Sequence, residues 1–289
     1  MKFNRKSPLA KVLEGLFSTY AEHVPDVNRI TNVMIHRGFI GKQEDIVNDH
    51  IAFRTMGVQH LGIQSLEKIF LHFGYKREDF YRFEKKKLNA YWYSPPSEEF
   101  PRVFISELCV NELSKDAQSI IRTYTDSVPY DPVNKLNLEN TDDVIAFFSS
   151  PLWEIPTWSD YQFLLNESEY AAWVIYNRYY LNHYTISVHT LPNPINNLVT
   201  FNQFLQSLGI KLNDAGGEIK ASPDKLLLQS STVAQKVNAL FRSGDSHIIS
   251  GSYVEFAERK STKNGIREGF EAGNADKIFE STFRSQTEK

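Results

Sequence analysis

The sequence contains 289 residues, of which 41% are hydrophobic and 13% aromatic, and its formal net charge is −3. This length and composition allow a substantial buried core and exclude a disordered chain, while the charge balance gives no basis for binding nucleic acid or an anionic membrane. The single cysteine, Cys109, excludes an intramolecular disulfide and a cysteine-rich zinc site. Residues 1–11 are basic without the apolar core of a signal peptide, and no run reaches the length of a membrane span, so we expect a soluble, cytoplasmic protein.

The first third of the chain predicts two helices and then a βαβββ order of elements. Apolar residues recur at helical spacing over residues 9–17, and Pro25 begins a second helix that ends near Gly38. Residues 50–55 have the composition of a strand and residues 66–73 the pattern of a helix. Three further runs rich in β-forming residues follow, at residues 81–83, 90–93 and 103–108.

The same order of elements recurs after a helical stretch. Helical periodicity fills much of residues 112–180, with helices predicted at residues 119–124, 142–148 and 169–180. A strand at residues 183–188 and a helix at residues 198–208 follow. Three strand candidates complete the second copy, at residues 218–221, 226–230 and 252–259. Aligning His50 with His183 places the two copies 133 residues apart, which indicates an internal repeat.

These elements predict an α+β fold in a single domain, residues 1–289. Two βαβββ-like modules pressed together form a curved mixed sheet around a central site on its concave face, with additional helices at the N-terminus and between the modules. The expected parts are N-terminal helices, first module, helical insertion, second module and C-terminal tail, at residues 1–45, 46–111, 112–180, 181–260 and 261–289. Within the tail, residues 261–273 predict a loop and residues 281–289 a frayed end.

Two histidines on predicted strands point to a metal site. His50 lies on the first strand of the first module, and His183 lies on the corresponding strand of the second. We prefer His183 to the nearby His189 because Thr185 and Ser187 give the face of His183 a polar, cavity-lining character. Two imidazoles and one carboxylate form a facial triad, which holds a divalent metal and leaves positions open for substrate and oxygen.

Glu255 is the preferred carboxylate for this triad. It lies in the strand-like run from Tyr253 to Arg259, in which alternation places Glu258 on the opposite face. Glu107 is the rival carboxylate, because it occupies the matching place in the first module by our reading of the repeat. A glyoxalase-like metal site could use Glu107, so both carboxylates stay open at this point.

Arg54 shares a strand face with His50, two pleats away. Burying a histidine and an arginine in one cavity is costly unless each has a partner, such as a metal or a substrate carboxylate. The alternative interpretation is a salt bridge between Arg54 and an acidic residue at the surface.

At these segments the chain resembles a family formerly described as a domain of unknown function and now associated with 2-oxoadipate dioxygenase/decarboxylase, also called 2-hydroxyglutarate synthase. That family is similar to the vicinal oxygen chelate enzymes. The resemblance rests on four segments, namely the His50…Arg54 pair, Asn182-His183-Tyr184-Thr185, the run from Tyr253 to Arg259 and the run from Asn264 to Glu271. It implies that His50, His183 and Glu255 hold the metal and that Arg54 binds a substrate carboxylate.

The resemblance implies an Fe(II)-dependent dioxygenase and decarboxylase. Such an enzyme converts a 2-oxo dicarboxylic acid similar to 2-oxoadipate and O₂ into a 2-hydroxy acid and CO₂, with Arg54 as the catalytic-site residue that clamps the substrate. Fe(II) is the expected cofactor, and zinc, nickel or manganese could occupy the same donors in a purified sample.

Two other functions stay open at this point. A zinc- or nickel-dependent isomerase, lyase or hydrolase could use the same scaffold, because two histidines and a carboxylate also suit zinc and because a fold does not determine its chemistry. A non-catalytic ligand-binding protein is the other alternative. The sequence contains no HExxH, P-loop or serine-elbow motif, which removes the usual support for zincin, nucleotide-hydrolysing and α/β-hydrolase functions.

Overall fold

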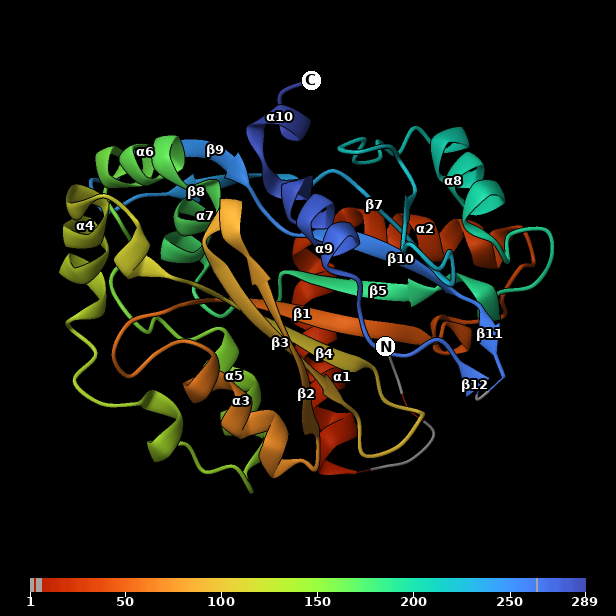
Figure 1. Cartoon of the computed structure of the whole chain (residues 1–289), viewed down its shortest axis with the longest axis horizontal. Helices are drawn as coiled ribbons and strands as arrows, with labels where there is room; N and C mark the ends of the chain where they lie inside the picture. Colours follow the sequence, from red (N-terminus) through yellow and green to blue (C-terminus); the bar gives the residue numbers. More distant parts are fainter. Residues whose placement is uncertain (1–2, 4–6, 264) are drawn as a thin grey trace.

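The structure, a computed structural model, describes residue 3, residues 7–263 and residues 265–289. Eight strands form one curved mixed sheet in the order β2-β3-β4-β1-β5-β10-β7-β6 (Figure 1). These strands are β1 (Asn48–Met56), β2 (Lys76–Phe83), β3 (Leu88–Ser94), β4 (Arg102–Leu108), β5 (His183–Ser187), β6 (Lys220–Ala221), β7 (Leu227–Ser231) and β10 (Tyr253–Arg259). Helices pack around the sheet, so the predicted α+β class is confirmed.

The sheet consists of two modules with the same topology, as the internal repeat predicted. The first module runs β1-α3-β2-β3-β4 and the second runs β5-α8-β6-β7-β10, where α3 is Ile63–His72 and α8 is Leu198–Ser207. In each module the first strand pairs in parallel with the last, and β1 pairs with β5 in antiparallel fashion to join the modules. The strand order read outward from this junction is therefore the same on both sides.

Side-chain alternation along β1 divides the core from the cavity. Ile51 and Phe53 are buried in the hydrophobic core, whereas His50, Ala52 and Arg54 carry their side chains toward the cavity on the concave face. The strand is buried along almost its whole length, which is the pattern expected at the centre of a sheet covered on both faces.

Two N-terminal helices, α1 (Pro8–His23) and α2 (Pro25–His36), match their predicted positions. The Ser7 side chain caps α1 by accepting a hydrogen bond from the Ala10 amide, and the predicted apolar stripe of this helix is buried. The Tyr20 hydroxyl donates to the carbonyl of Tyr253 and so links α1 to β10. No helix in the described part of the chain is long and apolar enough to cross a membrane.

The insertion between the modules is helical, as predicted, and its last helix caps one end of the sheet. Its helices are α4 (Lys115–Thr125), α5 (Thr141–Phe148), α6 (Trp158–Glu167) and α7 (Glu169–Asn177). Helix α6 was not predicted, because only Tyr161 and Leu164 on it are buried and its apolar periodicity is weak. Helix α7 ends earlier than predicted, because Arg178 adopts a φ of 57° that cannot continue a helix.

An unpredicted hairpin separates β7 from β10. It consists of β8 (Lys236–Leu240) and β9 (Ser246–Ser250), which pair with each other in a sheet of their own. The prediction missed it because its side chains are mostly exposed and half-buried, so the sequence lacks the apolar run of a core strand.

The expected loop is confirmed for residues 267–271, which lie in no helix or strand, whereas the expectation of a frayed C-terminal end is wrong. The expected loop contains a small ribbon of β11 (Ser261–Thr262) and β12 (Gly265–Ile266), and the end of the chain forms α9 (Ala272–Ile278), a 3-10 turn η6 (Phe279–Thr282) and α10 (Arg284–Thr287). Ser281 is fully buried, with its Oγ 2.8 Å from Ser231 Oγ and 2.9 Å from Asn213 Nδ2. Small polar residues that suggest fraying therefore hold this C-terminal segment, residues 270–287, onto the second module.

Candidate metal centre and adjoining cavity

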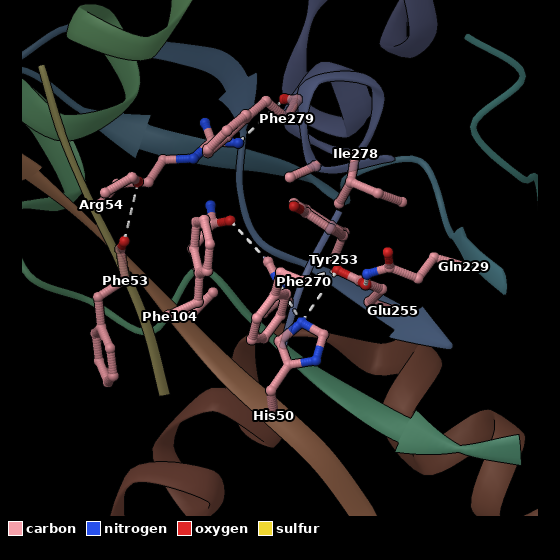
Figure 2. Close-up of a pocket in the computed structure, with 15 residues that line it drawn as sticks. His50, Phe53, Arg54, Phe104, Gln229, Tyr253, Glu255, Phe270, Ile278 and Phe279 are labelled. Carbon is pink, nitrogen blue, oxygen red and sulfur yellow. Dashed lines mark hydrogen bonds and ion pairs between the residues drawn. The ribbon is translucent and has the colours of Figure 1, made fainter. Parts of the chain in front are cut away.

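Three side chains predicted to hold a metal converge on the concave face of the sheet. His183 Nε2 lies 3.0 Å and His50 Nε2 lies 3.5 Å from Glu255 Oε2, and the two Nε2 atoms are 3.4 Å apart. Figure 2 shows His50 facing Glu255. All three residues are buried, with exposed fractions of 2% for His50, 6% for His183 and 1% for Glu255. We call this cluster the triad.

The sheet register explains the convergence. The triad residues lie on three adjacent strands, β1, β5 and β10. Ala52 pairs with His183 across the first two strands, and Thr185 pairs with Glu255 across the next two. Because residues that pair directly or two positions apart share a sheet face, the three side chains meet on the concave side.

A side-chain oxygen of the preceding residue orients each imidazole. His50 Nδ1 lies 2.8 Å from Asp49 Oδ1, and His183 Nδ1 lies 3.0 Å from Asn182 Oδ1. Since each acceptor requires a proton on Nδ1, both rings present Nε2 to the centre of the triad. In the sequence, the signal for this arrangement is a polar residue with a side-chain oxygen directly before each histidine, as Asp49-His50 and Asn182-His183.

The Glu255 carboxylate is held in the same way. Gln229 Nε2 donates to Glu255 Oε1 at 2.6 Å, which leaves Oε2 facing the imidazoles. Burial alone would raise the pKa of Glu255, but His50 and His183 lower it to about 2, so the group is ionised at neutral pH. The pKa of His50 is raised, because the attraction of Glu255 and Asp49 outweighs the effect of burial. The pKa of His183 is lowered, because burial outweighs the attraction of Glu255.

The donor set fits a divalent metal ion. One nitrogen or oxygen from each triad residue lies within 4.8 Å of the other two. Such spacing suits three ligands that each lie about 2.0–2.2 Å from a common ion. Both imidazoles have the required tautomer and the carboxylate is ionised, so the chemistry of the donors agrees with their geometry.

Glu107, the rival carboxylate, lies outside this cluster. It pairs with Thr55 on β1, faces away from the triad and accepts a hydrogen bond from the Ile63 amide at 2.8 Å. Ala52 and Thr185 are equivalent positions, because each lies two residues after the histidine of its module. Ala52 pairs with Phe104 and Thr185 pairs with Glu255, so Phe104 is the residue that matches Glu255. Our placement of Glu107 at the matching position was therefore wrong by three residues, whereas its exclusion from the ligand set that the family resemblance implies agrees with the geometry.

Arg54 reaches the same cavity but does not form a surface salt bridge. Its guanidinium donates to Thr282 Oγ1 at 2.9 Å and to the Phe279 carbonyl at 3.1 Å, both in the C-terminal segment. It also lies against the rings of Tyr170, Trp173 and Phe279, with distances of 5.2, 5.2 and 5.6 Å to the ring centroids. The side chain is 1% exposed, and its Nε has no hydrogen-bond partner.

Among the described residues, no acidic side chain forms an ion pair with Arg54. A buried guanidinium without a counter-ion is costly, because its desolvation is only partly offset by neutral hydrogen bonds and ring contacts. The alternative interpretation of Arg54, a salt bridge to an acidic residue at the surface, is therefore wrong. Arg54 lines a cavity on the same sheet face as the triad.

The cavity between the triad and Arg54 is small and mostly apolar. The centre of a water-sized molecule can move within about 20 Å³, which is room for about one water. Phe104 closes it from the first module, and Phe270, Ile278 and Phe279 close it from the C-terminal segment (Figure 2). Sequence reasoning missed these covering residues because it treated the C-terminal segment as a tail.

A buried ion pair between Arg259 and Asp49 lies beside the triad. Arg259 Nε and Nη2 donate to Asp49 at 2.6 and 3.0 Å, and Asp49 is the residue that orients His50. Arg259 Nη1 donates to the Gly269 carbonyl at 2.7 Å, next to Phe270, whose ring lies 4.8 Å from that of His50. Arg259 thus braces a triad histidine and part of its apolar cover at the same time.

Comparison with known proteins agrees with this arrangement. The family model for 2-oxoadipate dioxygenase/decarboxylase matches residues 12–265. A chloroplastic 2-oxoadipate dioxygenase/decarboxylase from Arabidopsis thaliana is 42% identical over 266 residues, covering 84% of this chain and 70% of the relative. The crystal structure of the hydroxyglutarate synthase from Oryza sativa in complex with 2-oxoadipate is 40% identical, with a TM-score of 0.85 and coverage of 96% of this chain and 93% of that chain.

A more distant structure shares the fold alone. A glyoxalase-superfamily protein from Ralstonia eutropha superposes with a TM-score of 0.72 at 19% identity, covering 94% of this chain and 90% of that chain. This similarity agrees with the paired βαβββ modules. The family model and the close relatives both cover most of the sequence, and the chain therefore belongs to the 2-oxoadipate dioxygenase/decarboxylase family.

Proposed function

We propose that this protein is an Fe(II)-dependent dioxygenase and decarboxylase that acts on a 2-oxo dicarboxylic acid of the 2-oxoadipate class. With O₂ as the oxidant, the products would be CO₂ and a 2-hydroxy acid one carbon shorter than the substrate. The observation that carries this proposal is the pairing of a two-histidine, one-carboxylate triad with a buried arginine that has no counter-ion, on one face of one sheet. The names of the relatives support the same reaction.

In this proposal His50, His183 and Glu255 hold the metal. When bound there, Fe(II) would supply the activation of dioxygen and the attachment point for the 2-oxo acid. The remaining protein groups keep the ligands in place, since Asp49, Asn182 and Gln229 each hold one triad residue by a hydrogen bond. Phe104, at the position that matches Glu255, is not a metal ligand, so the protein would supply three ligands and leave the other coordination positions to substrate and O₂.

Arg54 would supply the counter-charge for the substrate carboxylate farthest from the metal. Its Nε–H makes no hydrogen bond, its side chain lines the cavity, and no carboxylate among the described residues forms an ion pair with it. A carboxylate bound there would convert a desolvated single charge into a charge-assisted pair. This preference would favour diacids over monoacids of the same length.

The C-terminal segment would have to move for a diacid to enter. A 2-oxo diacid is several times larger than a water, whereas the cavity has room for about one. Phe270, Ile278 and Phe279 form the cover, and the two hydrogen bonds from Arg54 to this segment would be exchanged for contacts with the substrate. Closure of the same apolar cover would then exclude water from the reacting groups.

An anaerobic reconstitution assay tests the proposal. The metal-free protein would be loaded with Fe(II) and given 2-oxo acids one at a time, and O₂ would then be admitted while O₂ uptake, CO₂ release and the shortened 2-hydroxy acid are measured. Turnover that needs both Fe(II) and O₂ is expected with the diacids. Turnover with zinc or nickel in the absence of O₂ would favour an isomerase, lyase or hydrolase instead, and binding without turnover under any metal would favour a ligand-binding protein.

A further inference from the structure

Two neighbouring tyrosines carry fully buried hydroxyl groups that make no hydrogen bond, Tyr253 on β10 and Tyr184 on β5. Their strands are adjacent, but the two rings lie on opposite faces of the sheet. Tyr253 pairs with His183 and lines the cavity, whereas Tyr184 pairs with Val254 and packs against aromatic rings of α1. The two hydroxyls are therefore alike in burial and differ in whether a ligand can reach them.

The Tyr253 ring extends from the triad toward Arg54. Its centroid lies 4.7 Å from that of His183, with an angle of 30° between the ring planes. Burial raises the pKa of the Tyr253 hydroxyl, and the nearby Arg54 guanidinium opposes that rise. Figure 2 shows the ring between the triad and the guanidinium, with the hydroxyl directed toward the Arg54 end of the cavity.

An unused hydroxyl in this place needs an explanation. A buried donor without a partner costs free energy, and phenylalanine would fill the same space at no such cost. The Arg54 Nε–H, on the same cavity, is a second donor without a partner. The Arg54 guanidinium and the Tyr253 hydroxyl also lie close enough to interact with each other, so these donors from β1 and β10 can both reach one ligand that offers two acceptor oxygens, as a carboxylate does.

We infer that the Tyr253 hydroxyl and the Arg54 Nε–H together bind the substrate carboxylate that lies away from the metal, which makes Tyr253 a specificity-determining residue. This inference rests on the proposed function for the identity of the ligand as a 2-oxo diacid. Each oxygen of the carboxylate accepts one hydrogen bond, and the guanidinium supplies the positive charge. Tyr253 stays protonated and gives up no proton, so its role is recognition and not acid–base chemistry.

A matched pair of variants tests the inference. Tyr253→Phe removes the hydroxyl that faces the cavity, and Tyr184→Phe removes one that is equally buried on the other face of the sheet. Each protein would be loaded with Co(II) under anaerobic conditions, and the Kd of 2-oxoadipate and of 2-oxohexanoate, the corresponding monoacid, would be measured by calorimetry. The Kd of Co(II) itself and the kcat/KM of the Fe(II) form would be measured in parallel.

Tyr253→Phe should weaken 2-oxoadipate binding about tenfold to hundredfold, as expected for loss of a hydrogen bond to a charged group. Binding of 2-oxohexanoate and of Co(II) should be unchanged, and Tyr184→Phe should match the parent in all measurements. Equal loss of both acids in Tyr253→Phe, or no loss of either, would overturn the inference and leave the proposed function standing. Hydroxyl-dependent diacid binding without O₂ consumption would overturn the proposed reaction alone, and a parent protein that binds no 2-oxo diacid would overturn both.

Discussion

Replacement of Arg54 by methionine separates the effect of its buried charge on the free energy of unfolding from its effect on substrate binding. The wild-type guanidinium is 1% exposed, donates two hydrogen bonds to the C-terminal segment and lies against three aromatic rings. These contacts offset a desolvation penalty of several kcal/mol, so a neutral side chain of similar length should alter the free energy of unfolding far less than it alters catalysis. The triad and its hydrogen bonds do not involve Arg54, so metal binding should be retained.

The effect on the reaction should be large and specific. Loss of one partner from a desolvated charge pair costs about 2–5 kcal/mol, so kcat/KM for 2-oxoadipate should fall by about thirtyfold to several thousandfold. The Arg54→Met variant should discriminate little between 2-oxoadipate and 2-oxohexanoate, and Arg54→Lys should recover little activity because a point charge cannot reproduce the planar donor set.

Three measurements on the same preparations test these expectations. Steady-state oxygen consumption gives kcat/KM for both acids, calorimetry gives the Kd of Co(II), and urea denaturation gives the free energy of unfolding. An Arg54→Met protein that turns over 2-oxoadipate at the parent kcat/KM would show that Arg54 does not bind the substrate and serves only to hold the C-terminal segment. A large loss of Co(II) affinity would also contradict a role of Arg54 in substrate binding, because the effect on turnover would then come from a damaged triad.

Alanine at any position of the triad should sharply reduce Co(II) affinity in calorimetry, whereas Glu107→Gln should leave it unchanged, and the reverse result would contradict the ligand assignment. Lys220 is buried and its pKa is lowered by burial to about 8, from 10.5 in the unfolded chain. The folded state therefore binds fewer protons than the unfolded state between these values, so the free energy of unfolding of the wild type, relative to Lys220→Met, should rise as pH increases from 8 to 10.5 in urea denaturation. If the difference in free energy of unfolding between the wild type and Lys220→Met did not change over that range, burial would not disfavour the charged form of Lys220. Lys86 pairs with two carboxylates of the C-terminal segment at 2.8 and 3.1 Å, so Lys86→Met should speed amide hydrogen exchange across residues 272–287 about fivefold, as loss of about 1 kcal/mol implies, with Lys85→Met as the control that should not.

The internal repeat and the positions of its two histidines could be predicted without the structure. Strand alternation and the order of elements are local properties, so the run around His50 and the run around His183 could be recognised as equivalent strands without knowledge of their neighbours. The same local rule placed Arg54 on the face of His50, and both side chains do reach one cavity. The family resemblance selected Glu255, which spacing alone had left in competition with Glu107.

Only the tertiary structure decided which residues complete the site. The choice between Glu107 and Phe104 as the counterpart of Glu255 depends on the register between β1 and β4, and a shift of an odd number of residues moves a side chain to the other sheet face. The C-terminal segment covers the cavity through hydrogen bonds and apolar contacts to strands distant in sequence, which its short polar helices do not reveal. Register and long-range packing arise from the fit between elements, and a single sequence records each element but not that fit.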